Sequence, residues 1–378
     1  MAFGFRKPCF IGVDFGTASI KIVELSIKND RPVLVNYGQV SLVDLEKGTP
    51  PQGRSYDEEI ILHLKALVKR MEPHGRSASV AMPAFTGLVS LIEFPMMEES
   101  ELQEAIRFEA HKHIPSSLDE VAINWEVVGR HNVSGDGEKM EVLLVAALNK
   151  EVSRYEKYIA GTGFSLDFLE LETFSITRSI ISNKEKGTFL IIDIGSRATN
   201  LILIENGIIK ASRNLDMGGK DVTRVLAESL NITEDRAKVL KKSGKDFLIA
   251  PESALVFPAL QMIAREAERM LATCQAKHPD VKCKQIVLSG GTAQFIGLAK
   301  YYENLLKLPV VLGDPWKNVQ YDPKLARKVN ELGPAFSVAI GLALRHIDTA
   351  FQKEDALSMG HKKPNVVISF LKDLFKNK

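Results

Sequence analysis

Along the chain, apolar residues change between two spacings, and these changes predict where strands and helices lie. From residue 10 to residue 40, short apolar runs of strand type are joined by tight turns. Over residues 56–71 the apolar positions recur at helical spacing, and residues 101–115 and 150–163 show the same period. Further strands are predicted at 77–83, 87–95, 120–130 and 140–148, with a surface loop at 131–139. Strands and helices therefore alternate, which is typical of α/β proteins.

The second half of the chain repeats this alternation and then changes in character. A strand leads into a helix over 166–181, and a strand, a turn and a second strand follow at 189–204. The later pattern predicts mainly helices over 216–280, a strand at 285–291, a helix at 293–306, a strand at 309–313 and an apolar helix at 335–347. Residues 348–365 are polar and poorly periodic, so they are interpreted as a linker before a short basic amphipathic segment, 366–378.

One short motif occurs twice, each time in a strand, a turn and a second strand. "IGVDFGTASIKIVEL" begins at residue 11, and "FLIIDIGSRATNLILI" begins at residue 189. Asp14 and Asp193 are 179 residues apart, and the pairs Gly16 with Gly195 and Thr17 with Ser196 have the same separation. A motif that returns in the same context indicates a duplication, so two related lobes are the predicted architecture.

Composition and charge narrow the class of protein. The 378 residues are enough for two medium domains or one large two-lobed protein. The chain carries 49 lysines and arginines against 47 acids, so its net charge of +2 predicts no general attraction to nucleic acid. Cys9, Cys274 and Cys283 have no metal-ligand spacing and indicate a reducing compartment. Without an apolar leader or a membrane-length apolar stretch, the sequence predicts a cytoplasmic protein.

The two glycine turns are suited to binding phosphate. Glycine and small hydroxyl residues allow the backbone to approach an anion, with N–H groups and hydroxyls directed at it. An aspartate beside that anion would repel it unless a divalent cation such as Mg²⁺ lay between them. One such turn alone is more often an ordinary hairpin with a surface acid, but a pair favours binding. Asp14 and Asp193 therefore predict a metal and a polyphosphate.

Two further glycine pairs extend this pattern. "SGGTAQFIG" follows an apolar strand, and Gly290 and Gly291 would allow a nucleoside or phosphate to approach where that strand ends and a helix opens. The alternative is a plain strand-to-helix turn. "DMGGKDVT" supplies a similar corner at Gly218 and Gly219. The sequence has neither a P-loop nor a dinucleotide-binding glycine motif, which disfavours those two enzyme classes.

These motifs resemble those of the superfamily of actin, heat-shock chaperones and sugar kinases. "IGVDFGTASIKIVEL" is similar to its first phosphate motif, "LIIDIGSRATNLILI" to the second and "IVLSGGTAQFIG" to its adenosine motif. Within it, "GLVSLIEFPMMEESELQEAIRFEAHKHIPSSLDEVAINWEVV" and "AREAERMLATCQAK" resemble the PilM family of type IV pilus assembly proteins, which is similar to the division protein FtsA. The resemblance covers about residues 10–347.

The resemblance implies a bilobal actin-like ATPase fold of the α/β class, with duplicated ribonuclease H-like lobes and a small α+β subdomain inserted in the first lobe. Residues 8–186 would form the first lobe, with the insertion at about 81–150. Residues 187–332 would form the second lobe, with a mainly helical subdomain at about 216–283. A helix at 333–348 would return to the first lobe, and 349–378 would be linker and tail.

Carried over by position, the resemblance also implies a site for ATP and Mg²⁺. Asp14 and Asp193 would organise the metal and the phosphates. The further residues implied at the nucleotide are Gly16, Thr17, Ser19, Lys21, Gly195, Ser196, Gly218, Gly219, Arg269, Gly290, Gly291 and Thr292. For Lys21 the alternative is a solvated cross-strand charge, and for Arg269 it is a solvated helix face.

Two positions in this pattern leave the chemistry open. Arg197 stands in the second turn where relatives often carry a small residue, so it would either reach the phosphates or crowd them. No hydrolytic base is identified in segment 166–181, where Glu172 is the one acid considered, with a surface position as the alternative. The sequence therefore leaves enzymatic activity undecided, at most a slow Mg-dependent ATPase.

The resemblance implies a cytoplasmic scaffold at the inner membrane that binds the N-terminal cytoplasmic peptide of PilN in a nucleotide-sensitive way. Other implied partners are the pilus inner-membrane platform and motor proteins, with membrane association through partners and possible self-association. The strand at 87–95 fits either a wall of a peptide groove or plain core.

Two alternative functions stay open, namely an FtsA-like membrane-tethered filament former and a small-molecule kinase. The tail at 366–378 fits weak membrane contact, disorder or intramolecular docking.

Overall fold

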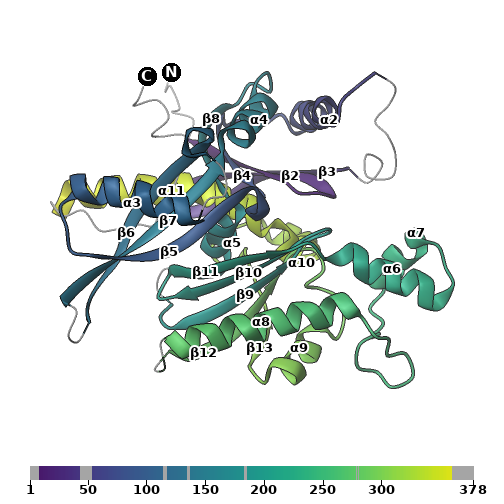
Figure 1. Cartoon of the computed structure of the whole chain (residues 1–378). Helices are drawn as coiled ribbons and strands as arrows, with labels where there is room; N and C mark the ends of the chain where they lie inside the picture. Colours follow the sequence, from purple (N-terminus) through teal and green to yellow (C-terminus); the bar gives the residue numbers. More distant parts are fainter. Residues whose placement is uncertain are drawn as a thin grey trace, which may run out of the picture.

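Two sheets with the same strand order form the framework of the protein (Figure 1). The structure is a computed structural model that describes residues 8–42, 53–113, 117–133, 137–182, 185–277, 279 and 281–359. The first sheet contains, in spatial order, β3 (Arg31–Ser41), β2 (Ser19–Lys28), β1 (Cys9–Phe15), β4 (Ser77–Met82) and β8 (Ser165–Leu171). The second contains β11 (Ile208–Leu215), β10 (Thr199–Glu205), β9 (Thr188–Ile194), β12 (Cys283–Ser289) and β13 (Val310–Leu312). In each sheet an antiparallel meander is followed by two parallel strands, as the internal repeat predicts.

Four helices pack around the first sheet, and they are α2 (Tyr56–Met71), α4 (Asn149–Ile159), α5 (Glu172–Ile180) and α11 (Ser337–Met359). The helix α2 has the bounds predicted from its period and begins with a capping box in which Ser55 and Glu58 exchange hydrogen bonds. The helix α11 returns from the second lobe and contacts α5, β1, β2 and β4. It lies so close to β1 that a Cβ atom on Gly12 would collide with the backbone of Ala339. This close contact holds the last helix, α11, against the first strand, β1.

The second sheet has a buried layer on each face because its strands alternate apolar side chains. Leu190, Ile192, Leu201 and Leu203 pack in one cluster with the helices α8 (Pro258–Lys277) and α9 (Leu298–Leu306). Ile191 and Ile202, on the opposite face, belong to the cluster that fills the first lobe. The helices α6 (Gly219–Leu230) and α7 (Glu234–Lys241) stand at the end of this lobe, on the right of Figure 1. Between β13 and α11 the chain forms η3 (Pro323–Leu325), α10 (Ala326–Leu332) and η4 (Gly333–Phe336).

A small α+β subdomain is inserted between β4 and α4. After η1 (Ala84–Thr86), its sheet has the order β5 (Gly87–Pro95), β7 (Gly137–Leu148) and β6 (Val121–Val133), and α3 (Glu99–His113) and η2 (Leu118–Glu120) connect β5 to β6. Leu102 and Ile106 of α3 pack on Leu144 at one face of this sheet. At the other face, Leu143 belongs to the same buried cluster as Ile202 of the second lobe, and β5 contacts β11. The insertion therefore reaches across to the second lobe.

Three predicted segments differ from the structure. The loop expected at 131–139 is shorter, because β6 continues to Val133 and β7 starts at Gly137, where cross-strand pairing persists. The helix expected at 293–306 begins only at Leu298, since Gly297 has a φ of 84° that interrupts helical geometry. The interpreted linker is partly helical, because α11 continues to Met359, with neither glycine nor proline between residues 348 and 359. The predicted amphipathic segment 366–378 lies outside the described residues.

Within the part of the chain that the structure describes, no helix combines the length and apolar character needed to cross a membrane.

Candidate functional site

The two repeated motifs form hairpins of matching geometry, one in each sheet. Asp14 lies opposite Lys21 in the β1–β2 pair, and Asp193 lies opposite Asn200 in the β9–β10 pair. Both aspartates are buried, with 5% and 7% of their surfaces exposed. Each is the second-last residue of a strand that also has a parallel neighbour, so each turn opens at an edge where α/β folds bind ligands.

The first turn brings together five of the predicted residues. Lys21 donates from Nζ to Oδ2 of Asp14 at 2.8 Å, and both side chains are largely buried. A Cβ atom on Gly16 would lie 3.1 Å from the carbonyl oxygen of Ser19 and 3.6 Å from Nζ of Lys21. Thr17 is half-buried between them in the turn. Lys21 is thus a buried partner of Asp14 and not a solvated cross-strand charge.

The second turn is packed against the start of α6. Gly219 donates its backbone N–H to the carbonyl of Gly195 at 2.9 Å, and Lys220 donates to the carbonyl of Ser196 at 2.8 Å. A Cβ atom on Gly218 would lie 2.8 Å from the carbonyl oxygen of Gly195. The glycine pair is therefore required for this close approach of two backbones, and it fixes the second turn in place.

The third glycine segment meets the second turn from β12. Gly290 has a φ of 85°, and a Cβ atom there would collide with the backbone of Ile194. Thr292 donates its N–H to the carbonyl of Ile194 at 3.2 Å. Gly291, in contrast, has open surroundings, because a Cβ atom on it would meet only the side chain of Ala335, at 4.0 Å. Ser289, opposite Asp193 in the β9–β12 pair, forms a hydrogen bond with it.

Glu172, at the start of α5, lies among the two aspartates rather than on the surface. Its Oε1 accepts hydrogen bonds from the backbone N–H of Ala84 at 3.0 Å and from Nδ2 of Asn200 at 2.8 Å. Burial, together with the negative charges of Asp193 and Asp14, raises the pKa of Glu172 to about 7. Of the two positions considered for this acid, the structure supports the one at the site.

The centre of the site is short of positive charge. Burial raises the pKa of Asp193 to about 6, the negative charge of Asp14 adds to the rise, and hydrogen bonding by Ser289 and attraction to Lys21 oppose it. The carboxyl groups of Asp14, Asp193 and Glu172 thus lie near the ammonium group of Lys21, which is bonded to Asp14. Among the described residues, no cluster of three or more acidic, histidine or cysteine side chains is arranged to hold a metal ion. A divalent cation here would need oxygens from phosphate and water as well.

Lys241 belongs to the same constellation, although the sequence gives no signal for it. From α7 it donates Nζ to the carbonyl of Gly219 at 2.9 Å, beside Thr292. Burial and the nearby charges of Lys242 and Lys238 lower its pKa to about 8. The run "KVLKK" contains three lysines, and only the fold decides which of them points to α6.

Two predicted arginines make their contacts elsewhere. Arg197 is exposed at the rim of the second turn and pairs with Asp216, with 3.4 Å between Nε and Oδ1. Arg269 is exposed on α8, where its Nη1 lies 3.7 Å from Oε2 of Glu266 on the same helix. Its ion pair supports the alternative of a solvated helix face.

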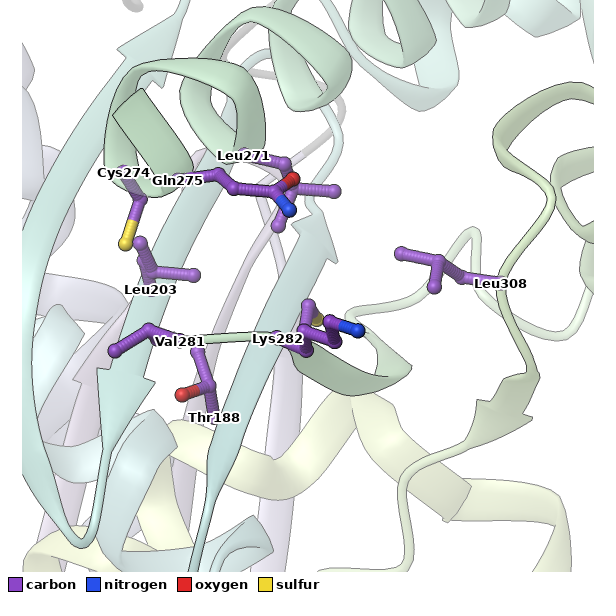
Figure 2. A pocket seen from close by; sticks show the side chains of 9 residues that line it. Thr188, Leu203, Leu271, Cys274, Gln275, Val281, Lys282 and Leu308 are labelled. Atoms are coloured by element: carbon purple, nitrogen blue, oxygen red, sulfur yellow. The ribbon is translucent and has the colours of Figure 1, made fainter. Parts of the chain in front are cut away.

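A separate cavity of about 270 Å³ lies near the start of β9 and β12, beside the last turns of α8 (Figure 2). Its walls include Leu203, Leu271 and Leu308, with Cys274 and Cys283 alongside. Burial raises the pKa of both thiols, which suits small, unreactive side chains. Thr188, at the other end of β9 from Asp193, also lines it, so this cavity is not part of the site at the glycine turns.

Two lobes of the same topology, each with a buried aspartate before a glycine turn, define the class as the actin-like ATPase fold. The chain belongs to the PilM family, because the sequence pattern of "Type IV pilus assembly protein PilM" matches residues 12–347. Its fold is similar to that of a chain in the solved PilM-PilN type IV pilus biogenesis complex, with a TM-score of 0.74 and 25% identity over 90% of this chain and 99% of that chain.

Curated relatives include the cell division protein FtsA of two bacteria. The Neisseria meningitidis protein is 22% identical over 262 residues, 61% of each chain. The Pseudomonas aeruginosa protein is 23% identical over 284 residues, 68% of this chain and 66% of its own length. The chain therefore spans less than two thirds of the length of these curated relatives.

Proposed function

We propose that this protein is an ATP-binding actin-like scaffold of type IV pilus assembly. The observation that carries the proposal is the meeting of two hairpins, one from each lobe, whose aspartates Asp14 and Asp193 are both buried and lie close enough for the negative charge of Asp14 to raise the pKa of Asp193. A ligand held by both turns favours the lobe arrangement in which both can reach it. The nucleotide would thereby set the relative position of the lobes.

In this proposal each group of site residues has a separate task. The turn at Gly16, Thr17 and Ser19 and the turn at Gly195 and Ser196 offer backbone N–H groups and hydroxyls to the phosphates. The open face at Gly291 leaves room for the nucleoside, beside Thr292 and the α6 corner. Lys21 and Lys241 supply positive charge from opposite lobes.

The residues present also fit Mg²⁺. Asp14 and Asp193 are buried acids on facing turns, and the raised pKa of Asp193 reflects a local lack of positive charge. Mg²⁺ prefers oxygen ligands and commonly binds through one or two carboxylates together with substrate phosphates and water. Bound here, it would neutralise the two acids and the phosphates they face.

Hydrolysis of ATP would depend on Glu172. Glu172 is the acid placed to orient a water molecule, and its pKa of about 7 suits proton transfer near neutral pH. Its Oε1 is, however, already engaged by Ala84 and Asn200. We therefore expect turnover to be slow at most, with binding rather than catalysis as the main role.

The proposed partner is the N-terminal cytoplasmic peptide of PilN, which would bind to the inserted subdomain. Support comes from the PilM family assignment and from the likeness to a chain of the PilM-PilN complex. In the described part of the subdomain, β5 contacts β11 of the second lobe, whereas the outer edge of β6 has no further strand paired to it, and an extended peptide can add to such an edge. Phe85, 59% exposed at the start of the insertion, offers an apolar contact. This partner would bring the protein to the cytoplasmic face of the inner membrane, beside the platform and motor proteins.

A specific observation supports one alternative function, that of a filament former. Several FtsA proteins are relatives over about 60% of the chain, so a filament former is the second candidate. The match to the PilM family across residues 12–347 favours the scaffold. Sedimentation with and without Mg-ATP at rising protein concentration separates the two, because a filament former pellets only with nucleotide and above a threshold. A small-molecule kinase has no comparable support.

Thermal unfolding with Mg-ATP, Mg-ADP and EDTA, with phosphate release followed in the same sample, tests the proposal. At a hundredfold excess over the dissociation constant, a ligand that binds only the native state stabilises it by about 2.7 kcal/mol. We expect protection that requires Mg²⁺ and little phosphate release. A PilN-derived peptide, titrated into each state, then tests the scaffold role. Absence of protection by nucleotide would refute the ATP-binding part.

A further inference from the structure

The first residue of the inserted subdomain that can donate a backbone hydrogen bond is attached to the centre of the nucleotide site. Pro83 has no N–H group, and Ala84, next along the chain, donates to Oε1 of Glu172 at 3.0 Å. The same oxygen accepts from Asn200 of the second lobe at 2.8 Å. Asn200 in turn accepts from Nδ2 of Asn214 on β11 at 2.6 Å. One carboxylate oxygen thus joins the root of the insertion to both lobes.

The far end of the insertion is attached to the second lobe by a buried ion pair. Lys210 of β11 lies 2.8 Å and 2.9 Å from the two oxygens of Glu141 on β7, and its Nζ is 3.6 Å from Glu205. The side chains of Lys210 and Glu141 are only 15% and 11% exposed. A Cβ atom on Gly129, beside a bulge in β6, would lie 2.5 Å from Oε2 of Glu141, so glycine makes room for this carboxylate.

These two attachments give the insertion a position between the lobes. Its chain connections, at Met82 and Asn149, lead only to elements of the first lobe. Its far end is held by the second lobe through Lys210 and through apolar packing of Leu143 in the cluster that contains Ile202. Packed interfaces change between discrete arrangements rather than deform smoothly. Any change in the lobe arrangement must therefore move the insertion about its root or break its far contact.

We propose that the inserted subdomain senses the nucleotide site, with Glu172 holding its root at Ala84 and Lys210 holding its far end to the second lobe. This inference rests on the proposed function, because it needs nucleotide between the lobes. Without a cation, Glu172 is kept beside Asp193 and Asp14 against their repulsion by the two hydrogen bonds it accepts. Bound Mg-nucleotide would change the charge around Glu172 and weaken the bond from Ala84, with Oε1 still engaged by Asn200. The peptide-binding surface of the insertion thereby becomes sensitive to nucleotide.

Hydrogen exchange of the full chain measures this weakening directly. The segments to follow are residues 84–88 at the root and 137–142 at the far end, because β5 and β7 pair so that Gly87 lies beside Ala147 and Pro95 beside Lys139. The helix α8 is the reference. Each sample is compared without nucleotide and with Mg-ADP or Mg-ATP at concentrations that saturate that variant, as measured by separate titration. In the wild type we expect exchange at 84–86 to rise at least threefold with nucleotide, because an amide exchanges when its hydrogen bond opens.

Variants separate the two attachments. Glu172→Gln weakens the charge-assisted bond to Ala84, so its root should exchange quickly even without nucleotide and respond little to it. Glu141→Gln should leave the root responsive, whereas residues 137–142 at the far end exchange faster in every state. Glu303→Gln, which alters an exposed ion pair with Lys300 on α9, is the matched control and should behave as the wild type. Circular dichroism and thermal unfolding establish that each variant is folded before exchange is compared.

The outcomes distinguish this inference from the proposed function. If nucleotide binds but exchange at 84–88 stays unchanged in the wild type, the sensing role is wrong and the nucleotide site stands. A Glu172→Gln protein whose root behaves as the wild type also overturns it. Failure of nucleotide to bind at all overturns both proposals.

Discussion

Lys21 and Asn200 are counterparts in the two lobes, since each lies opposite the buried aspartate of its own hairpin. They are separated by the same 179 residues as Asp14 and Asp193. Lys21 neutralises Asp14 through a bond of 2.8 Å, whereas the neutral amide of Asn200 donates to Glu172 and also hydrogen-bonds Asp193. The duplicated site is therefore asymmetric in charge, with the uncompensated acids on the side of the second lobe.

This asymmetry predicts that both aspartates are needed for nucleotide, for different reasons. Asp14→Asn should leave Lys21 without its charged partner, and Asp193→Asn should remove the acid that most lacks a cation. We expect either change to reduce the thermal protection by Mg-ATP to near zero, which corresponds to at least a hundredfold weaker binding and about 2.7 kcal/mol of lost protection. Glu303→Gln on the exposed face of α9 is the control. Full protection in either aspartate variant would contradict the metal assignment.

The raised pKa values of Asp193, about 6, and Glu172, about 7, predict how the nucleotide-free protein responds to pH. Unfolded, these groups lose their protons near pH 4, but the native protein keeps them up to pH 6 to 7. The unfolded state binds fewer protons in that interval, so stability falls as pH rises from about 4 to about 7.

Asp193→Asn removes part of this penalty. Relative to the wild type, we expect it to be more stable by about 2 to 3 kcal/mol at pH 8 and little changed at pH 4, because its pKa is raised by about two units and each unit corresponds to about 1.4 kcal/mol. Urea unfolding at the two pH values, without Mg²⁺ or nucleotide, measures the difference. Equal effects at both pH values would argue against a strained acid at this position.

Replacing Lys241 should stabilise the nucleotide-free protein but weaken its binding of nucleotide. Its pKa is lowered to about 8, so near neutral pH the native protein keeps a charged amine where burial disfavours it. Lys241→Met should stabilise the protein without nucleotide by about 1 kcal/mol at pH 7 and weaken Mg-ATP binding about tenfold. Lys242→Met, at the exposed neighbour, is the matched control. Tighter or unchanged nucleotide binding in Lys241→Met would exclude Lys241 from the site.

Much of the site could be predicted because the duplication is visible in the chain itself. Asp14 and Asp193 are found by their shared spacing, and spacing alone also relates the two glycine turns. Lys241 could not be found in this way, because it approaches Gly219 only after α7 folds back against α6. The place of Glu172 is ambiguous in the sequence for the same reason, as it depends on the meeting of α5 with β10.

The ion pair between Glu141 and Lys210 should contribute more than a surface pair. Both side chains are nearly excluded from water, and removing one partner leaves the other charge buried. In a double-mutant cycle with Glu141→Ala and Lys210→Ala, we expect single losses of about 2 to 4 kcal/mol and a coupling energy of about 1 to 3 kcal/mol. Urea unfolding supplies all four free energies. Purely additive losses would mean that the two side chains act independently.

Gly290 and Gly207 offer a comparison that separates backbone conformation from crowding. Their φ angles are 85° and 86°, but a Cβ atom on Gly207 meets nothing within 4 Å, whereas one on Gly290 collides with the backbone of Ile194. Gly207→Ala should cost only the conformational strain, about 1 kcal/mol. Gly290→Ala should cost at least about 3 kcal/mol, because the neighbour is backbone and cannot rotate away.

Since Ile194 follows Asp193 directly, Gly290→Ala should also weaken Mg-ATP binding, and Gly207→Ala should not. Urea unfolding and nucleotide titration of the two variants measure both effects, and equal losses would show that close packing of β12 on the second turn is unimportant.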